Sequence, residues 1–290
     1  MKELKGICCA LCTPFTDDGE SVDETALRNH IDSMIDAGIH IILVCGGTGE
    51  FAYLRPEERR RIAEIASKHI DGRAAFMVQT SAINSGDAIE YAKHAEGVGA
   101  DALLILPPYF EGPDADGVYD FYAAIGSAVK TPLMAYNIPV HSGFDIDPDF
   151  FRRLREIDGV QFIKDSTADL LRIQMLLETG AKVFNGGDPT AFFALVAGCP
   201  GCVWGAPNAM PNESVALYDH VQAGRLVEAA ALWKRMFPTN AFFWNHVYNA
   251  AVKAATNASG RPVGPCRKPV RPLTETEAAE LRQAMKPLGY

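Results

Sequence analysis

The sequence predicts an α/β fold, a (β/α)8 TIM barrel with a C-terminal helical region. Three observations support this prediction. Short apolar or β-branched runs recur along the chain, a segment with helical spacing follows each of them, and the runs are apolar throughout rather than alternating. Strands buried on both faces are typical of parallel sheets. Eight strand-helix units come before residue 214, and this length of chain is close to the ~250 residues of a usual barrel.

The expected strands are all short. In chain order they cover residues 6–12, 39–45, 74–80, 100–106, 132–137, 160–164, 181–185 and 201–205. A doubly wound open sheet is the alternative arrangement. However, no Gly-x-Gly-x-x-Gly fingerprint follows the first run. Unusual residues follow several strands rather than one switch point, which favours the closed barrel.

Amphipathic helices are expected between these strands. Residues 23–37 place Leu27, Ile31 and Met34 on one face, and residues 57–70 have the same spacing of apolar positions. Glycines often stand just before the next strand, as expected where helices end. The pattern therefore alternates strand and helix from the first unit to the eighth.

The end of the chain is expected to be helical. We predict a barrel domain over 1–213 and a helical region over 214–290, packed on the barrel because no long linker separates them. The helices expected there cover residues 215–223, 226–237, 241–257 and 274–285.

Composition and charge exclude several classes of function. The chain has 290 residues, of which 48% are hydrophobic and 22% charged, as in an ordinary globular protein. The 36 acidic residues outnumber the 27 basic ones, so the net charge of −9 repels nucleic acid and anionic membranes. No run approaches the ~20 apolar residues needed to span a bilayer. We expect a cytoplasmic protein with a small-molecule partner.

Seven cysteines do not suggest a disulfide framework at this chain length. Cys8, Cys9 and Cys12 crowd into one apolar segment and are expected to be small buried hydrophobic residues. A zinc or redox site built from Cys9, Cys12, Cys199 and Cys202 is an alternative. Three-residue spacing within a strand sends Cys9 and Cys12 to opposite faces, so we expect no metal.

Lys164 is the first candidate catalytic residue, because working groups of such barrels stand at the C-terminal ends of strands. It is the last residue of the expected strand over 160–164. Alternation along a strand places it on the same side as Val160 and Phe162, and this side can be the barrel interior. Burial disfavours the ammonium and supplies the neutral amine that forms a Schiff base. The alternative is a structural ion pair with Asp165.

Tyr136 ends the preceding strand, and neighbouring strands lie only ~4.8 Å apart. A phenol beside a lysine can transfer protons. The alternative is a core tyrosine whose hydroxyl reaches the rim. After the second strand, Gly47 and Thr48 belong to a glycine-rich loop whose backbone N–H groups and hydroxyl suit an anion such as a carboxylate. A plain glycine turn is the alternative there.

Three ordered motifs are similar to those of a known family. They are Gly-Gly-Thr-Gly-Glu-Phe at 46–51, Tyr-Asn-Ile-Pro at 136–139 and Lys-Asp at 164–165. In these motifs, and along the whole chain, the sequence resembles the dihydrodipicolinate synthase / N-acetylneuraminate lyase family.

The resemblance implies a barrel enzyme, usually a homotetramer, that acts as a class I aldolase or lyase without a metal or other cofactor. Its covalent intermediate would be an imine between Lys164 and pyruvate or another 2-oxo acid. Tyr136 would pass protons to and from the bound substrate. Thr48 and the neighbouring amides, including that of Gly47, would hold the substrate carboxylate.

Departures from the family's synthase branch bear on the substrate. That branch has a second threonine in the glycine-rich motif, a tyrosine given to the neighbouring subunit's site and an arginine after Tyr-Asn-x-Pro. Here the same positions hold Gly47, Phe110 and His141. These differences count against the synthase reaction, while the Gly-Gly-Thr-Gly-Glu-Phe motif and Leu-Pro-Pro-Tyr at 106–109 resemble sugar-acid dehydratase or aldolase branches. We therefore expect sugar-acid or amino-acid breakdown, with dihydrodipicolinate synthase activity as the alternative.

The sialic-acid lyase branch also differs, since its sugar-binding acid and a later serine correspond here to Pro189 and Ala206. The distal end of the substrate is expected to contact His141, Ser142, Gly187 and Asp188. A non-catalytic sensor that binds a 2-oxo acid is a further alternative.

Overall fold

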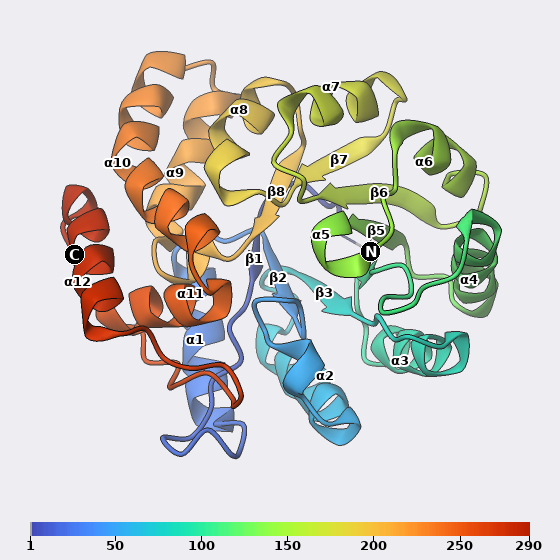
Figure 1. The fold of residues 1–290 in the computed structure, drawn as a ribbon, viewed down its shortest axis with the longest axis horizontal. Helices are drawn as coiled ribbons and strands as arrows, with labels where there is room; N and C mark the ends of the chain where they lie inside the picture. The colour runs from blue at the N-terminus through green and yellow to red at the C-terminus, as the bar shows by residue number, and fades with distance from the viewer. Residues whose placement is uncertain (1) are drawn as a thin grey trace.

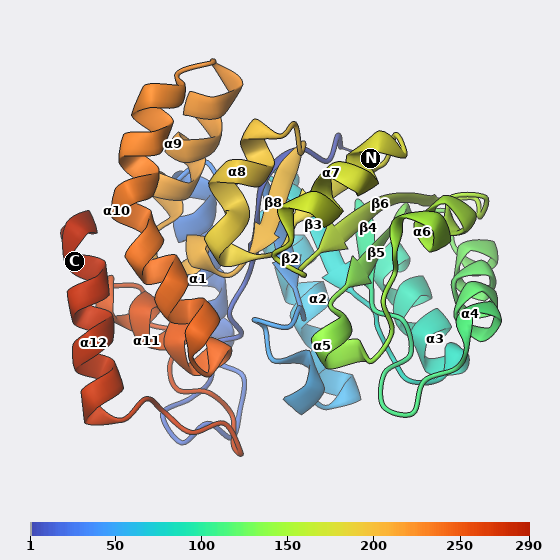
Figure 2. The same cartoon turned by 45° about the horizontal axis from the view of Figure 1, so that its top comes forward.

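A closed parallel barrel forms the centre of the molecule in the computed structural model, which describes residues 2–290. Each strand pairs with the next one along the chain, and the first pairs with the eighth (Figures 1 and 2). The strands are β1 (Gly6–Ala10), β2 (Ile41–Val44), β3 (Ala75–Gln79), β4 (Ala102–Ile105), β5 (Leu133–Asn137), β6 (Val160–Asp165), β7 (Lys182–Asn185) and β8 (Gly201–Trp204). The predicted (β/α)8 barrel is confirmed.

Two apolar cores explain why the strands are apolar throughout. Alternate strand residues fill the barrel interior, among them Cys8, Leu43, Met77, Leu104, Met134 and Val203. Their neighbours point outward and pack under the helices, among them Cys9, Ile42, Val78, Leu103 and Ile163. Both faces of each strand are therefore buried, as in other sheets covered by crossover helices.

A register shift in β6 corrects one expectation. Leu133 pairs with Val160 and Met134 pairs with Phe162, so Gln161 has no partner in the ladder. Val160 consequently packs in the outer core, whereas Phe162 lies in the interior. The expectation that Val160 shares the side of the later interior residues of this strand is wrong, because the extra residue breaks the alternation.

A helix follows each strand and covers the barrel (Figure 1). Those helices are α1 (Glu24–Asp36), α2 (Pro56–Ile70), α3 (Ser85–Gly97), α4 (Ala115–Ala128), α6 (Pro148–Leu154), α7 (Leu170–Glu178), α8 (Ala191–Val196) and α9 (Pro211–Gln222). Side-chain caps start several of them: Asp23, Asn84, Asp114, Asp147 and Asp169 accept hydrogen bonds from first-turn N–H groups.

Shorter helical turns lie after several strands. They are η1 (Phe51–Tyr53), α5 (Pro139–Ser142), η2 (Asp188–Thr190) and η3 (Ala206–Asn208). These turns belong to the loops at the C-terminal end of the barrel and so help to form that surface.

The C-terminal helices are α10 (Leu226–Asn245), α11 (Tyr248–Ala258) and α12 (Glu275–Met285), followed by η4 (Lys286–Leu288). Both views place α10 and α12 next to each other at one side of the barrel (Figures 1 and 2). The boundary expected between residues 213 and 214 falls inside α9, which follows β8 as the eighth barrel helix. The division into two regions stays a prediction.

The helix break expected between residues 237 and 241 is wrong. α10 continues through Pro238, although proline removes one helical hydrogen bond. Met236, Thr239 and Phe243 are fully buried on either side of it, so tertiary packing holds the helix together. The chain breaks instead at residues 246–247, which places Tyr248 at the start of α11.

None of the helices between residues 2 and 290 combines the length and the apolar character that crossing a bilayer requires.

Candidate active site

Tyr136 and Lys164 lie side by side where β5 and β6 end, because their Cα atoms are partners in the strand register. Both side chains are nearly buried, with 7% and 5% exposed. Lys164 Nζ lies over the face of the Tyr136 ring, 4.0 Å from its centroid. The structure therefore brings the two candidate catalytic residues together, with the amine against the π face of the tyrosine.

The Asp165 carboxylate has hydrogen-bond partners other than Lys164, with which a structural ion pair was the alternative. Its carboxylate accepts hydrogen bonds from Asn137 Nδ2 at 2.8 Å and from the Thr167 backbone N–H at 3.1 Å. Burial raises the pKa of Asp165, and these hydrogen bonds oppose that rise. Asp165 is thus held by the loop that follows β6 and by Asn137 of β5, whereas Lys164 Nζ lies over the Tyr136 ring.

Gly186 leaves the space that the lysine stem occupies. A Cβ atom at this position would lie 2.6 Å from Lys164 Cε and would also collide with the Ser166 hydroxyl. Ser166 is buried, and its Oγ has no hydrogen-bond partner in the structure. A free hydroxyl near the stem of Lys164 was not predicted from the sequence, because Ser166 lies beyond the recognised motif.

The glycine-rich loop after β2 lies against the C-terminal helices. Gly47 has open space around a hypothetical Cβ, and its carbonyl accepts a hydrogen bond from Asn249 Nδ2 at 3.1 Å. Thr48 is 6% exposed, and its side chain lies 3.2 Å from the position of a Cβ on Gly205. The loop therefore brings Thr48 to the end of β8, on the same end of the barrel as Lys164.

Asp188 is fully buried in η2, the turn that follows β7. Its Oδ2 accepts a hydrogen bond from the Tyr248 hydroxyl at 2.8 Å, while Oδ1 has no partner. The Gly205 backbone N–H in turn donates to Tyr248 Oη at 3.0 Å. Burial raises the pKa of Asp188 to about 7, opposed by the Tyr248 hydrogen bond and the charge of Lys164.

Tyr248 was missed by the sequence analysis. It belongs to α11, far along the chain from the strand ends, and the expected helix over 241–257 would have placed it in a helix interior. The structure instead ends α10 at Asn245 and starts a new helix at Tyr248. No local signal in the sequence shows that this tyrosine reaches the loop after β7.

The other expected substrate-binding residues differ in their exposure and in their hydrogen-bond partners. His141 is exposed on α5. Ser142 is buried, and its hydroxyl lies within hydrogen-bond distance of the carbonyls of Ile138 and Phe144, at 3.1 and 3.0 Å. The Gly187 carbonyl accepts a hydrogen bond from Asn185 Nδ2. The Ser142 hydroxyl thus already has backbone partners.

Phe110 is 79% exposed and has a positive φ of 61°. It belongs to the loop after β4, beside Tyr109, whose ring packs edge-on against Phe51. Burial raises the pKa of Tyr109.

The cysteines form no disulfide among the described residues. Cys9 and Cys12 belong to the same outer core, so the expectation of opposite faces is wrong. The reason is that β1 ends at Ala10, and Cys12 no longer follows the strand alternation. Burial raises the pKa of Cys12 to about 12. Between residues 2 and 290, no three His, Cys, Asp or Glu side chains are grouped closely enough to hold a metal ion.

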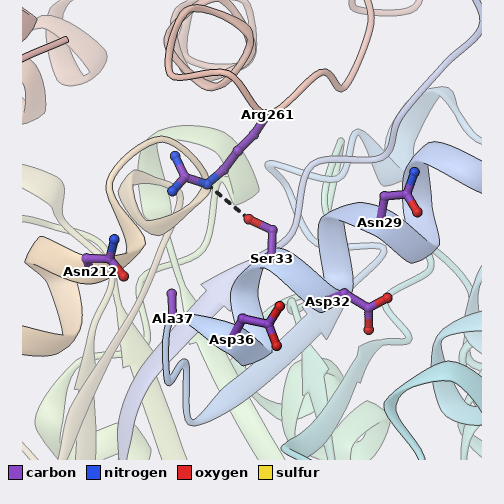
Figure 3. A pocket seen from close by; sticks show the side chains of 7 residues that line it. All are labelled: Asn29, Asp32, Ser33, Asp36, Ala37, Asn212 and Arg261. Atoms are coloured by element: carbon purple, nitrogen blue, oxygen red, sulfur yellow. Dashed lines mark hydrogen bonds between the residues drawn. The ribbon is translucent and has the colours of Figure 1, made fainter.

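Two surface pockets lie elsewhere on the molecule. The first, of about 470 Å³, lies along α1, where Arg261 Nε donates to Ser33 Oγ at 3.0 Å (Figure 3). Asp32 and Asp36 also line it. The second, of about 430 Å³, is lined by residues at the opposite end of the strands from Lys164, among them Leu4, Pro132, Gln161, Lys182 and Pro200.

Comparisons with known proteins agree with this geometry. The model of the dihydrodipicolinate synthetase family matches residues 3–288. A 4-hydroxy-tetrahydrodipicolinate synthase of Phenylobacterium zucineum is 32% identical over 289 residues, covering 99% of this chain and 98% of the relative.

Solved structures show the same similarity. A putative dihydrodipicolinate synthetase from Pseudomonas aeruginosa is 33% identical, with a TM-score of 0.94 over 99% of this chain and 100% of that one. A dihydrodipicolinate synthase from Acinetobacter baumannii, solved in complex with pyruvate, is 30% identical, with a TM-score of 0.94 over 99% of each chain.

Proposed function

Because this chain belongs to the dihydrodipicolinate synthetase family, we propose that it is a class I lyase or aldolase that binds a 2-oxo acid as an imine of Lys164. The observation that carries the proposal is the pairing of Tyr136 and Lys164 at adjacent strand ends, with Nζ 4.0 Å from the tyrosine ring centroid. Pyruvate is the first candidate substrate, since the related Acinetobacter enzyme was solved with it.

In the proposed reaction, the neutral amine of Lys164 attacks C2 of the 2-oxo acid and water leaves. The imine then acts as an electron sink, so a proton or an aldehyde fragment can leave the adjacent carbon as the enamine forms. Tyr136 lies next to the amine and is the proposed proton carrier for that carbon. The chemistry needs only side chains and substrate, and the absence of a cofactor is part of the proposal.

Thr48 and the backbone amides near Gly47 are proposed to bind the substrate carboxylate. Thr48 stands close to Gly205 at the end of β8, and the loop leaves open space beside Gly47. Oriented N–H groups and a hydroxyl are suitable donors for a carboxylate. His141, Ser142, Gly187 and Asp188 remain the proposed contacts for the rest of the substrate, of which Asp188 has a free oxygen.

The reaction partner has two candidates. The names of the relatives favour 4-hydroxy-tetrahydrodipicolinate synthase activity. In such a condensation the enamine would add to the carbonyl carbon of an aldehyde. Gly47, Phe110 and His141 count against that activity, because they replace three groups that the resemblance assigns to the synthase branch, and sugar-acid or amino-acid breakdown is the second candidate. A sensor that binds a 2-oxo acid without turnover is the third candidate.

Borohydride trapping tests the shared step. The protein is incubated with pyruvate, reduced, digested and mapped by peptide mass. We expect one reduced adduct, on Lys164, and none on the buried Lys253, which serves as an internal control. An adduct on another lysine, or none with pyruvate and longer 2-oxo acids, would contradict the proposal.

The Lys164→Arg variant keeps a positive charge but cannot form the imine. We expect it to fold, to give no adduct and to lose turnover. Wild-type protein that forms the adduct is then screened with aldehydes for condensation and with sugar acids for cleavage or dehydration. An adduct without turnover on any of them would favour the sensor.

Other expectations also stay predictions. The homotetramer comes from the resemblance, and the cytoplasmic location and the lack of nucleic-acid or membrane partners come from composition and charge.

A further inference from the structure

We propose that Asn249 is a positioning residue that directs the Thr48 backbone N–H towards the carboxylate of a bound 2-oxo acid. The proposal rests on the proposed function, because it explains how the glycine-rich loop is prepared for that carboxylate. Asn249 belongs to α11 and lies outside the motifs on which the resemblance depends. Its amide would act through the loop and would not itself contact the substrate.

The glycine-rich loop is held through its carbonyl groups. The Gly47 carbonyl accepts a hydrogen bond from the Glu50 N–H at 3.0 Å, which closes a turn. The Gly49 carbonyl accepts from the Thr13 hydroxyl at 2.7 Å. The N–H groups of Gly47 and Thr48 have no hydrogen-bond acceptor in the described part of the chain. The loop therefore presents free backbone donors, which are suitable for an anion.

One further hydrogen bond to this loop comes from a distant segment. Asn249 Nδ2 donates to the Gly47 carbonyl at 3.1 Å. The Gly47 carbonyl and the Thr48 N–H belong to the same peptide unit, which is planar and trans, so the two groups point in opposite directions. Because Asn249 fixes the carbonyl on the α11 side, it also fixes the N–H on the other side. Polarisation of this peptide unit by Asn249 makes the N–H a stronger donor.

Lys164 lies across the barrel mouth from the loop. β2 and β6 are four strands apart in the closed barrel of eight, so the loop after β2 stands opposite the end of β6. Both views place α11 beside β1 and β2, away from β5 and β6 (Figures 1 and 2). A Thr48 N–H that points away from α11 is therefore suitable for a carboxylate whose neighbouring carbon is bonded to Lys164.

Asn249 has a fixed position because α11 is anchored to the barrel on both sides of it. The preceding Tyr248 hydroxyl accepts the Gly205 N–H at 3.0 Å, where β8 ends. Lys253, one turn further on the same face of α11, lies 2.7 Å from Glu50 Oε1, and both side chains are almost completely buried. The helix thus contacts the loop at two points. A donor held in this way needs no ordering when the substrate binds.

A positioning role and a purely structural role affect different quantities. If Asn249 only stabilises α11 on the barrel, its loss changes the reactivity with all ketones or with none. If it positions the Thr48 N–H, its loss weakens the binding of ketones that carry a carboxylate. The half-saturating concentration then rises while the rate at saturation is kept, because Lys164 and Tyr136 are unchanged.

The test measures imine formation over a range of pyruvate concentrations. Borohydride added at timed intervals traps the imine, and mass spectrometry quantifies the Lys164 adduct. Asn249→Leu keeps a similar side-chain volume and excludes a substituting water. We expect it to raise the half-saturating pyruvate concentration roughly tenfold, about what one charge-assisted hydrogen bond contributes. The rate at saturation should stay within about twofold of the wild type.

Hydroxyacetone, a ketone without a carboxylate, provides the second readout. Its rate of adduct formation should be the same in Asn249→Leu and in the wild type. Asn245→Leu is the matched control, because it removes an asparagine hydrogen bond to the Ala241 carbonyl at the exposed end of α10. We expect this control to behave like the wild type with both ketones. Circular dichroism verifies the fold, and Asn249→Ala takes the place of a leucine variant that does not fold.

Failure of this proposal and failure of the proposed function can be distinguished. If the wild type forms no adduct with any 2-oxo acid, the proposed function fails. If the wild type forms the Lys164 adduct and folded Asn249→Leu keeps the half-saturating pyruvate concentration, the proposed function stands and the role of Asn249 is wrong. Equal losses with pyruvate and hydroxyacetone would also overturn that role, because they would show a general effect on the site.

Discussion

The position of the Lys164 side chain depends on single residues, above all on Gly186. It stands after β7, where any side chain would meet the stem of Lys164 and the hydroxyl of Ser166. Its lack of a Cβ is therefore a condition for the observed lysine position.

We predict that Gly186→Ala lowers the rate of imine formation about 100-fold, because a displacement near 1 Å can cost that much. The added methyl group would lie 2.6 Å from Lys164 Cε. Timed borohydride trapping gives the rate, and circular dichroism reports the fold. Gly97→Ala in α3 is the control, since nothing lies within 4 Å of its Cβ. An unchanged rate in Gly186→Ala would show that the lysine can relocate.

At the scale of elements, one buried histidine joins α1 to the end of the barrel. His30 Nε2 lies 2.8 Å from Asn208 Oδ1 in η3. Asn208 Oδ1 also accepts from the Cys12 N–H at 2.9 Å, and its Nδ2 donates to the Ala10 carbonyl at 2.8 Å. The amide thus connects a helix, the end of β1 and the turn after β8.

Burial lowers the pKa of His30 to about 4, from 6.5 in an exposed histidine. The folded state therefore keeps the ring neutral while the unfolded chain takes up a proton below pH 6.5. The contribution of the neutral ring to the free energy of unfolding is therefore complete above pH 6.5 and is lost as pH falls towards 4. The loss reaches about 3 kcal/mol at most, by the usual 1.36 kcal/mol per pKa unit.

We predict that His30→Gln unfolds with a shallower dependence of the free energy of unfolding on pH between 6.5 and 4 than the wild type. Urea unfolding at a series of pH values gives this slope. His141→Gln replaces an exposed histidine and controls for the loss of one imidazole. Equal slopes for the wild type and His30→Gln would mean that the buried ring does not resist protonation.

At the scale of the whole molecule, a buried ion pair connects the barrel to the C-terminal helices. Lys253 Nζ of α11 lies 2.7 Å from Glu50 Oε1 in the glycine-rich loop, and both side chains are almost completely buried. The Arg267 backbone N–H donates to Glu50 Oε2 at 2.9 Å, and Lys253 Nζ donates to the Pro265 carbonyl at 2.7 Å. Glu50 holds a positive φ of 60° within this network.

We predict that Lys253→Met lowers the free energy of unfolding by about 3–5 kcal/mol, because it leaves a buried carboxylate without its partner. The double variant Glu50→Gln with Lys253→Met should be more stable than the single one, since it removes the unpaired charge as well. Urea unfolding measures both. Lys5→Met, at an exposed pair with Glu3, is the control and should change stability little. A single variant as stable as the wild type would contradict the prediction.

The expected strands agree with the observed ones except at their ends. The runs 39–45 and 100–106 contain β2 and β4 but extend one or two residues beyond them. A strand that is buried on both faces consists of consecutive apolar residues. Composition and periodicity within each short run were therefore sufficient to identify the strands. The helix expected over 226–237 was too short. Helix propensity predicts an end at Pro238, but the buried residues of the following turn keep α10 helical beyond it.

The sequence by itself determined the barrel and the meeting of Tyr136 with Lys164, because parallel strands all end on one side and adjacent strand ends must be close. Only the tertiary structure decided the partners that come from distant segments. Tyr248 meets Asp188 across 60 positions, and Lys253 meets Glu50 through the packing of α11 on the barrel. Such contacts depend on how whole elements pack against one another, and the periodicity within one segment does not predict that packing.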